Sequence, residues 1–173
     1  DISGYLVPDQ ENVSAVRVKP KKLYKANHHS PSDHNVGWFL GRTKLVLTDH
    51  LNHIKDALVH TEALSQDVAV QKHRITVKSE DGDFMKGSLT VNYYPWFPKD
   101  GPCVASAVKE VGVRPRIENL YEMDIVLDKP ELWSTSDPRL YRVEVILKDE
   151  EGRPIDDYVT TTGVRFIEQK EGV

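Results

Sequence analysis

The sequence has few residues that could cross-link the chain or anchor it in a membrane. It contains one cysteine, Cys103, among 173 residues. A single cysteine cannot form an internal disulfide framework, and it leaves the redox compartment undecided. No apolar run approaches the ~18 residues that a membrane span needs, so we expect no membrane partner. The sequence opens at Asp1 without a methionine or a signal peptide, which predicts an internal segment of a longer chain and leaves localisation open.

An excess of basic residues is also missing. The chain has 23 Lys and Arg against 27 Asp and Glu, and its formal net charge is -4. Binding to nucleic acid requires a basic face, so the composition argues against a nucleic-acid partner. The length corresponds to one domain plus part of another, which is enough to bury a substantial core.

What the chain does contain is a succession of short segments with the alternation of β-strands. His73, Ile75 and Val77 alternate with Arg74 and other polar residues, which is the period of a strand with one buried face. The expected strands cover residues 52–64, 71–78, 85–94, 104–113, 117–127, 141–148 and 155–164. Strands at this spacing, separated by polar turns, predict an all-β fold: an antiparallel immunoglobulin-like β-sandwich.

One segment carries a resemblance to a known family. Residues 128–141 read DKPELWSTSDPRLY, and after two strands the chain continues with Gly163, Val164 and Arg165. This resembles the last sandwich domain of glycoside hydrolase family 2, the β-galactosidases, β-glucuronidases and β-mannosidases, where "P-x-L-W-S-x-x-x-P-x-L-Y" and "G-[FVI]-R" precede the catalytic barrel. Family members cleave β-glycosides with retention, using two carboxylates about 5 Å apart. The resemblance places both on the barrel, so it implies no catalytic residue in this chain.

A second match lies at the beginning of the chain. Residues 1–6 and 11–18 resemble "D-I-T-x-Y-L-x-x-G-E-N-x-[IL]-A-V-R-V", near the end of the family's N-terminal sugar-binding-type domain, and residues 41–49 resemble its closing strand. The resemblance therefore implies three parts. Residues 1–48 are the C-terminal strands of a jelly-roll-type sandwich, 49–168 form the immunoglobulin-like sandwich, and 169–173 begin the linker to a catalytic barrel.

The segment 27–42 is the candidate for contact with substrate. In the family, a loop before the closing strand reaches the sugar with an aspartate nine residues before the arginine of "G-I-x-R". Counting nine residues back from Arg42 reaches Asp33. The resemblance thus implies that Asp33 contacts the sugar, with His34 as a second donor and Trp38 as an apolar wall. The alternative is an exposed polar loop without a ligand.

The same segment invites a metal hypothesis, which the pattern does not favour. His28, His29, Asp33 and His34 offer ligand types suited to zinc. Adjacent histidines in an extended loop point apart, however, and no cysteine or Glu-x-x-His pair completes a tetrahedron. We therefore expect no metal site and no cofactor.

Two further tryptophans lie outside that segment. Trp133 stands in the middle of the family-like phrase, and we expect it to be buried between the sheets near Tyr141 and Val143. Trp96, within a proline-rich corner, is the better candidate for an exposed platform or an interdomain contact.

The sequence thus predicts a non-catalytic β-sandwich portion of a retaining, β-galactosidase-like glycosidase that positions the catalytic barrel. Its expected partners are the barrel and the N-terminal domain of the same parent chain, and carbohydrate substrate through that parent. The alternative is an immunoglobulin-like carbohydrate-binding or adhesion module of a cell-surface protein.

Overall fold

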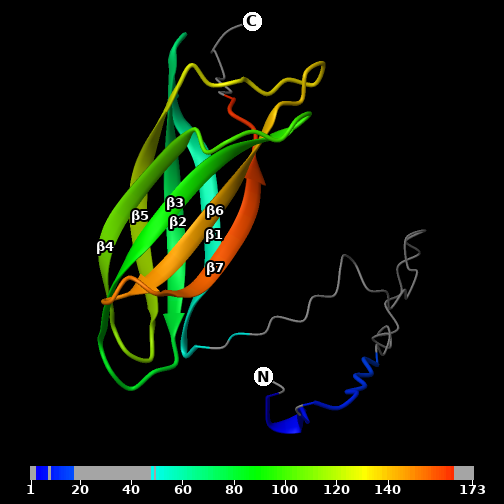
Figure 1. Ribbon diagram of the computed structural model, residues 1–173, viewed down its shortest axis with the longest axis vertical. Helices are drawn as coiled ribbons and strands as arrows, with labels where there is room; N and C mark the ends of the chain where they lie inside the picture. The colour runs from blue at the N-terminus through cyan, green and yellow to red at the C-terminus, as the bar shows by residue number, and fades with distance from the viewer. Residues whose placement is uncertain (1–2, 8, 18–47, 49, 166–173) are drawn as a thin grey trace, which may run out of the picture. The chain divides into compact units, whose positions relative to one another are not determined.

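A computed structural model describes residues 3–7, 9–17, 48 and 50–165 of the chain (Figure 1). The chain divides into two compact units, Asp1–Val46 and Leu47–Val173. Each unit is described by itself below. Among the described residues, no helix has both the length and the apolar character needed to cross a membrane.

The described part of the first unit is short. Ser3–Tyr5 forms a single 3-10 turn, η1, and the Asn12 amide fastens the following turn. Its Oδ1 accepts a hydrogen bond from the Val7 backbone N–H at 2.9 Å, and its Nδ2 donates to the Val7 carbonyl at 2.9 Å. Residues 3–7 and 9–17 contain no strand. The jelly-roll-type strands expected over 1–48 remain a prediction, because residues 18–47 lie outside the described part.

The second unit is an antiparallel sandwich of two sheets. One sheet has the strand order β1-β2-β5 and the other has the order β4-β3-β6-β7, and all neighbouring strands run antiparallel (Figure 1). The strands are β1 (Asn52–Leu64), β2 (Val68–Ser79), β3 (Met85–Phe97), β4 (Ala105–Val113), β5 (Glu118–Asp128), β6 (Leu140–Asp149) and β7 (Pro154–Thr162). The predicted all-β, antiparallel sandwich is therefore confirmed, and each expected strand after residue 50 occurs with small differences at its ends.

The alternating sequence explains why these segments pair in this way. In β6, Tyr141, Val143, Val145 and Leu147 are buried, whereas the residues between them are partly or fully exposed. A sheet with one face on the core and the other in water selects this pattern. The β6–β7 turn is closed by Gly152, whose φ of 79° is readily adopted by glycine.

A polar pair lies inside the core. Tyr93 and His73 are 0% and 1% exposed, and the His73 Nε2 lies 2.7 Å from the Tyr93 hydroxyl. Their rings meet edge to face with centroids 5.6 Å apart. Burial lowers the pKa of His73 to about 4 and raises the pKa of Tyr93 above its usual value. Both groups are therefore uncharged at neutral pH and satisfy each other through this hydrogen bond.

Side chains close the two long edges where the sheets meet. Beside β7, the Asp156 carboxylate accepts a hydrogen bond from the Ile54 backbone N–H of β1 at 2.6 Å. On the other side, the Tyr121 hydroxyl of β5 donates to the Gly112 carbonyl of β4 at 2.8 Å. These bonds use backbone groups that an open edge would offer to another chain, so they oppose edge-to-edge association.

Candidate functional site at one end of the sandwich

Several connections that are distant in sequence meet at one end of the sandwich. The β1–β2 turn, the β3–β4 connection, residues 129–139 between β5 and β6, and residues 163–165 after β7 all lie there (Figure 1). Antiparallel strands bring alternate connections to the same end, which is why these segments gather. Loops held by a rigid sheet are the usual carriers of function in such folds.

The segment 129–139 crosses this end and is fixed by a few bonds of its own. Leu132 forms a parallel bridge with Val164, and the Trp133 backbone N–H donates to the Val164 carbonyl at 2.9 Å. The Glu131 backbone N–H donates to the buried Tyr141 hydroxyl at 2.8 Å. The segment therefore has a defined path across the end although it contains no regular strand.

Trp133 lies against Gly163, and this contact corrects the expectation for Trp133. A Cβ added at Gly163 would lie 2.7 Å from the Cβ and Cγ of Trp133, so only glycine admits the side chain in this position. The Arg165 guanidinium carbon lies 4.6 Å above the indole, which is cation–π geometry. Trp133 is only partly buried, and the prediction that it fills the space between the sheets is wrong. The connection runs over the end, so its side chains pack on that end rather than inside.

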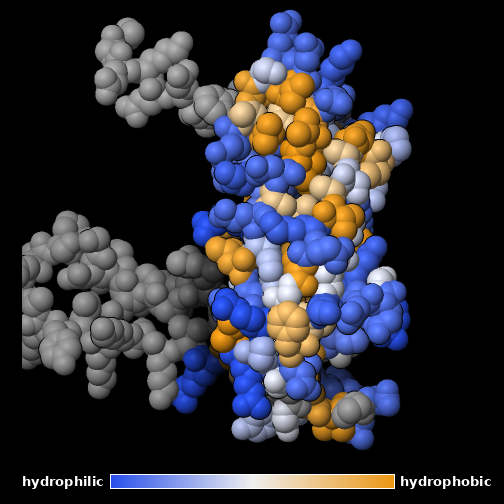
Figure 2. Space-filling model, turned by 90° about the vertical axis from the view of Figure 1, so that its left-hand side faces the viewer, coloured by the Kyte–Doolittle hydropathy of each residue, from blue (hydrophilic) through white to orange (hydrophobic). Residues whose placement is uncertain are grey.

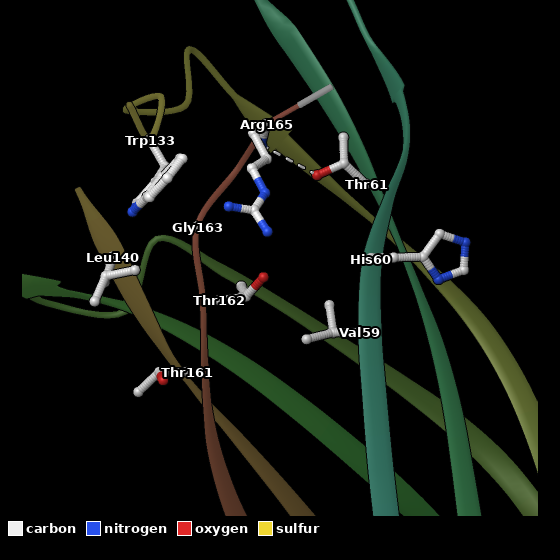
Figure 3. A pocket seen from close by; sticks show the side chains of 9 residues that line it. All are labelled: Val59, His60, Thr61, Trp133, Leu140, Thr161, Thr162, Gly163 and Arg165. Carbon is white, nitrogen blue, oxygen red and sulfur yellow. Dashed lines mark hydrogen bonds between the residues drawn. The ribbon is translucent and has the colours of Figure 1, made fainter. Parts of the chain in front are cut away.

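We call Trp133, Gly163 and Arg165 the exit cluster, because they lie where the described chain leaves the sandwich. Beside them is an open hollow of about 530 Å³, lined by residues of β1, β6, the β5–β6 connection and the end of β7. The lining residues are Val59, His60, Thr61, Trp133, Leu140, Thr161, Thr162, Gly163 and Arg165 (Figure 3).

One buried amide supports the wall of this hollow. Thr61 Oγ1 accepts hydrogen bonds from the Arg165 backbone N–H at 3.4 Å and from the Gln71 Nε2 at 3.0 Å. Gln71 is 0% exposed, so it holds Thr61 from inside the core. The Arg165 side chain points into the hollow, whereas His60 points away from it (Figure 3). The His60 ring pairs with Glu62 at 3.1 Å instead.

The hollow is suited to contact with another segment, and its lining lacks the groups that hydrolysis requires. None of its nine lining residues carries a carboxyl group, so it has no acid and nucleophile pair of the kind that retaining hydrolysis uses. A guanidinium and three threonine hydroxyls can donate hydrogen bonds to a carbonyl or carboxylate of another segment, and apolar side chains form part of the walls. Within the part of the chain that the structure describes, no three His, Cys, Asp or Glu side chains are grouped as metal ligands would be.

Exposed apolar side chains lie at the same end of the sandwich as the hollow. Trp96, Phe97, Val104 and Leu132 are 43%, 46%, 53% and 48% exposed. Hydrophobic side chains gather near the upper end of the sandwich in Figure 2, which is the end that carries the β5–β6 connection in Figure 1. Trp96 is thus exposed, and its role as a platform or an interdomain contact stays a prediction. Apolar patches of this kind mark contacts with other domains or ligands.

The site residues expected from the sequence are not among the described residues. Asp33, His34 and Trp38 fall outside the described residues, so their contact with sugar stays a prediction. Sequence reasoning missed the packing of Trp133 on Gly163 and of Arg165 on Trp133. A glycine inside a strand often marks close approach of another group, and Gly163 lies within the strand expected over 155–164.

Comparison with known proteins supplies the family. The family model described as glycosyl hydrolases family 2 matches residues 52–165. No curated protein matches the chain. Among solved structures, a β-glucuronidase from glycoside hydrolase family 2 is 22% identical with a TM-score of 0.61, and the match covers 66% of this chain and 13% of that one.

Two structures from Bacteroides give the same result. The Bacteroides uniformis β-glucuronidase is 23% identical with a TM-score of 0.60, covering 67% of this chain and 15% of that one. A putative β-galactosidase from Bacteroides fragilis is 22% identical with a TM-score of 0.60, covering 69% and 18%. These likenesses establish the sandwich fold, and the chain spans under a fifth of the length of each structure. The family match extends over both sheets and the exit cluster, and the chain belongs to family 2 of the glycosyl hydrolases.

Proposed function

We propose that this chain is a non-catalytic β-sandwich portion of a retaining β-glycosidase and that it positions the catalytic barrel. The exit cluster is the observation that carries the proposal. Arg165 is stacked on Trp133, Trp133 is seated on Gly163, and Val164 between them is 0% exposed. The direction in which the chain leaves the sandwich is therefore fixed by packing on both sides of Val164.

The surroundings of the exit cluster support this role. The exposed apolar side chains at the same end offer a surface on which a following domain could bury area, and the hollow beside Arg165 offers hydrogen-bond donors at its centre. The solved structures that resemble the chain are several times longer than it, which agrees with a part of a multidomain enzyme. In this proposal the partners are the barrel and the N-terminal domain of the parent, and carbohydrate binds through that parent.

The Asp33 segment completes the proposal at the substrate. Asp33 would accept hydrogen bonds from sugar hydroxyls, with His34 donating and Trp38 forming an apolar wall. This part rests on the family resemblance of residues 27–42, and it is tested separately from the positioning role.

The positioning role can be measured in the complete parent enzyme with Trp133→Ala. Misplacing catalytic groups by ~1 Å can cost about 100-fold in rate, so we expect kcat/KM for a chromogenic β-glycoside to fall at least ~10-fold while the sandwich stays folded. Phe84→Ala removes a ring that is 56% exposed in the β2–β3 turn and should leave kcat/KM unchanged. The 173-residue chain alone should hydrolyse no chromogenic β-galactoside, β-glucuronide or β-mannoside.

Two results would contradict the proposal. Turnover by the purified chain alone, above that of a mock preparation, would mean that the sandwich itself is catalytic. Wild-type kcat/KM in Trp133→Ala would mean that the exit cluster does not set the position of the barrel.

A further inference from the structure

A polar and aromatic cluster lies on the outer face of the four-stranded sheet. Asn92 of β3 is in register with Ser106 of β4 and Glu144 of β6, and in the next row Tyr94 faces Arg142. We call these five residues the Glu144 cluster. They share one face because residues directly opposite each other on neighbouring strands point to the same side of a sheet.

The carboxylate at the centre has unused acceptor capacity. Its Oε2 accepts from the Asn92 Nδ2 at 3.3 Å and from the Tyr94 hydroxyl at 3.4 Å, both longer than a typical hydrogen bond. Asn92 in turn accepts from the Ser106 hydroxyl at 2.7 Å. Among the described residues, the Glu144 Oε1 receives no hydrogen bond and Glu144 forms no ion pair. A carboxylate has about four lone-pair sites, so an added ligand could donate to it.

Arg142 and Tyr94 give the cluster a balanced charge and fixed geometry. The Arg142 guanidinium carbon lies 4.9 Å above the Tyr94 ring. Burial and the nearby Glu144 carboxylate raise the pKa of Tyr94, so its hydroxyl remains a donor. The negative charge of Glu144 and the positive charge of Arg142 offset each other. Together they favour a ligand that is itself uncharged but rich in hydrogen-bond donors and acceptors.

Aromatic rings follow this cluster along the same strand. Trp96 and Phe97 come directly after Pro95, and the pairing of β3 with β6 shifts register between Pro95 and Phe97. Such irregularities change the direction of side chains and are frequent next to binding sites. Both rings are exposed, and Trp96 comes two residues after Tyr94 in β3, so apolar surface follows the hydrogen-bonding groups along the strand.

We propose that this face binds a neutral oligosaccharide. Sugars present hydroxyl pairs and apolar C–H faces together: the hydroxyls would donate to Glu144 and accept from Arg142, while the C–H face would lie on Trp96. This binding needs no barrel and involves no residue of the exit cluster, so it can be measured on the 173-residue chain; it shares only Trp96 with the apolar surface proposed above for a following domain.

Affinity electrophoresis of the 173-residue chain tests the proposal directly. The probes are native gels containing galactomannan, arabinogalactan or mixed-linkage β-glucan. We expect retardation in at least one gel, and we expect Trp96→Ala and Glu144→Ala each to weaken it at least ~5-fold. Glu144→Gln, which keeps the shape of the side chain, should also weaken retardation. Phe84→Ala, the loss of another exposed ring, should leave it unchanged.

Circular dichroism establishes that each variant is folded before its mobility is compared. No retardation in any of the three gels would overturn the proposal. Retardation that survives both Trp96→Ala and Glu144→Ala would also overturn it, because the binding would then come from another part of the chain. Equal loss in Phe84→Ala would show nonspecific adhesion to exposed rings and would have the same consequence.

Discussion

Replacing Gly163 by alanine is the sharpest perturbation that the structure offers. The new Cβ would lie 2.7 Å from the Cβ and Cγ of Trp133 and 2.8 Å from its Cδ1, whereas carbon atoms pack at ~3.5 to 4.0 Å. The atoms it meets belong to the base of the indole side chain, which cannot swing away without moving the backbone of Trp133. Gly163→Ala must therefore displace Trp133, its neighbours, or both.

The expected cost comes from the contacts that such a displacement loses. Overpacking typically costs ~1 to 3 kcal/mol. Losing the stack of Arg165 on Trp133 adds ~0.5 to 1 kcal/mol at an exposed site. Lengthening the bond from the Trp133 N–H to the Val164 carbonyl adds up to ~1 kcal/mol. We expect the free energy of unfolding to fall by about 2 to 4 kcal/mol, since these terms overlap.

Urea denaturation followed by circular dichroism measures this change, and Gly82→Ala provides the matched control. A Cβ at Gly82 would meet only the Arg116 Nη2, at an ordinary 3.6 Å, so that variant should stay within ~0.5 kcal/mol of the wild type. In the Trp133→Ala background, the obstruction is gone and Gly163→Ala should cost much less. Equal costs of Gly163→Ala in both backgrounds, or a cost below ~0.5 kcal/mol, would refute the contact.

Two further predictions concern the core and the substrate. Burial holds the pKa of His73 at about 4, below the ~6.5 of an unfolded histidine. Below pH 6.5 the unfolded state therefore binds more protons than the folded state. The His73 contribution should lower the free energy of unfolding by about 3 kcal/mol between pH 7 and pH 4. His73→Gln should reduce that pH dependence in urea titrations, and an unchanged slope would mean that His73 is protonated in the folded state. In the complete enzyme, Asp33→Ala should lower kcat/KM at least ~10-fold at unchanged melting temperature, as expected for a lost charge-assisted bond of ~1.5 to 3 kcal/mol. Wild-type kinetics would show that the count back from Arg42 selects the wrong residue.

The strands could be predicted because their information is local. In β6 the buried residues Tyr141, Val143, Val145 and Leu147 alternate without interruption, so the sequence alone states both the strand and its inner face. The same holds for His73, whose polarity does not disturb the pattern because Tyr93 satisfies it. The alternation of apolar and polar residues, together with the turn residues, is enough to predict the strands, since each strand needs only a buried face and a neighbouring strand.

The end of the sandwich could not be predicted in the same way. The segment 129–139 has no strand period, so nothing local states which way Trp133 points. Its position depends on Gly163, thirty residues later, and on the parallel bridge between Leu132 and Val164. Likewise, the pairing of β4 with β3 rather than with a strand of the other sheet is a property of the assembled sandwich. Non-local contacts of this kind become visible only once the strands are in place.

Stability and the proposed positioning role rest on different residues in this domain, so mutations can test them separately. Among the described residues, the core contains eighteen buried hydrophobic side chains, whereas the exit cluster depends on one close glycine contact, one backbone hydrogen bond and one cation–π contact. Loosening the exit cluster by a few kcal/mol leaves most of the core intact. Its effect on geometry is larger, because a rotation of roughly 5° at Arg165 moves an atom ~20 Å away by nearly 2 Å, enough to misplace a catalytic group. A cluster that can be loosened while most of the core stays intact, and that strongly affects direction, is what a domain needs if its task is to hold another domain in place.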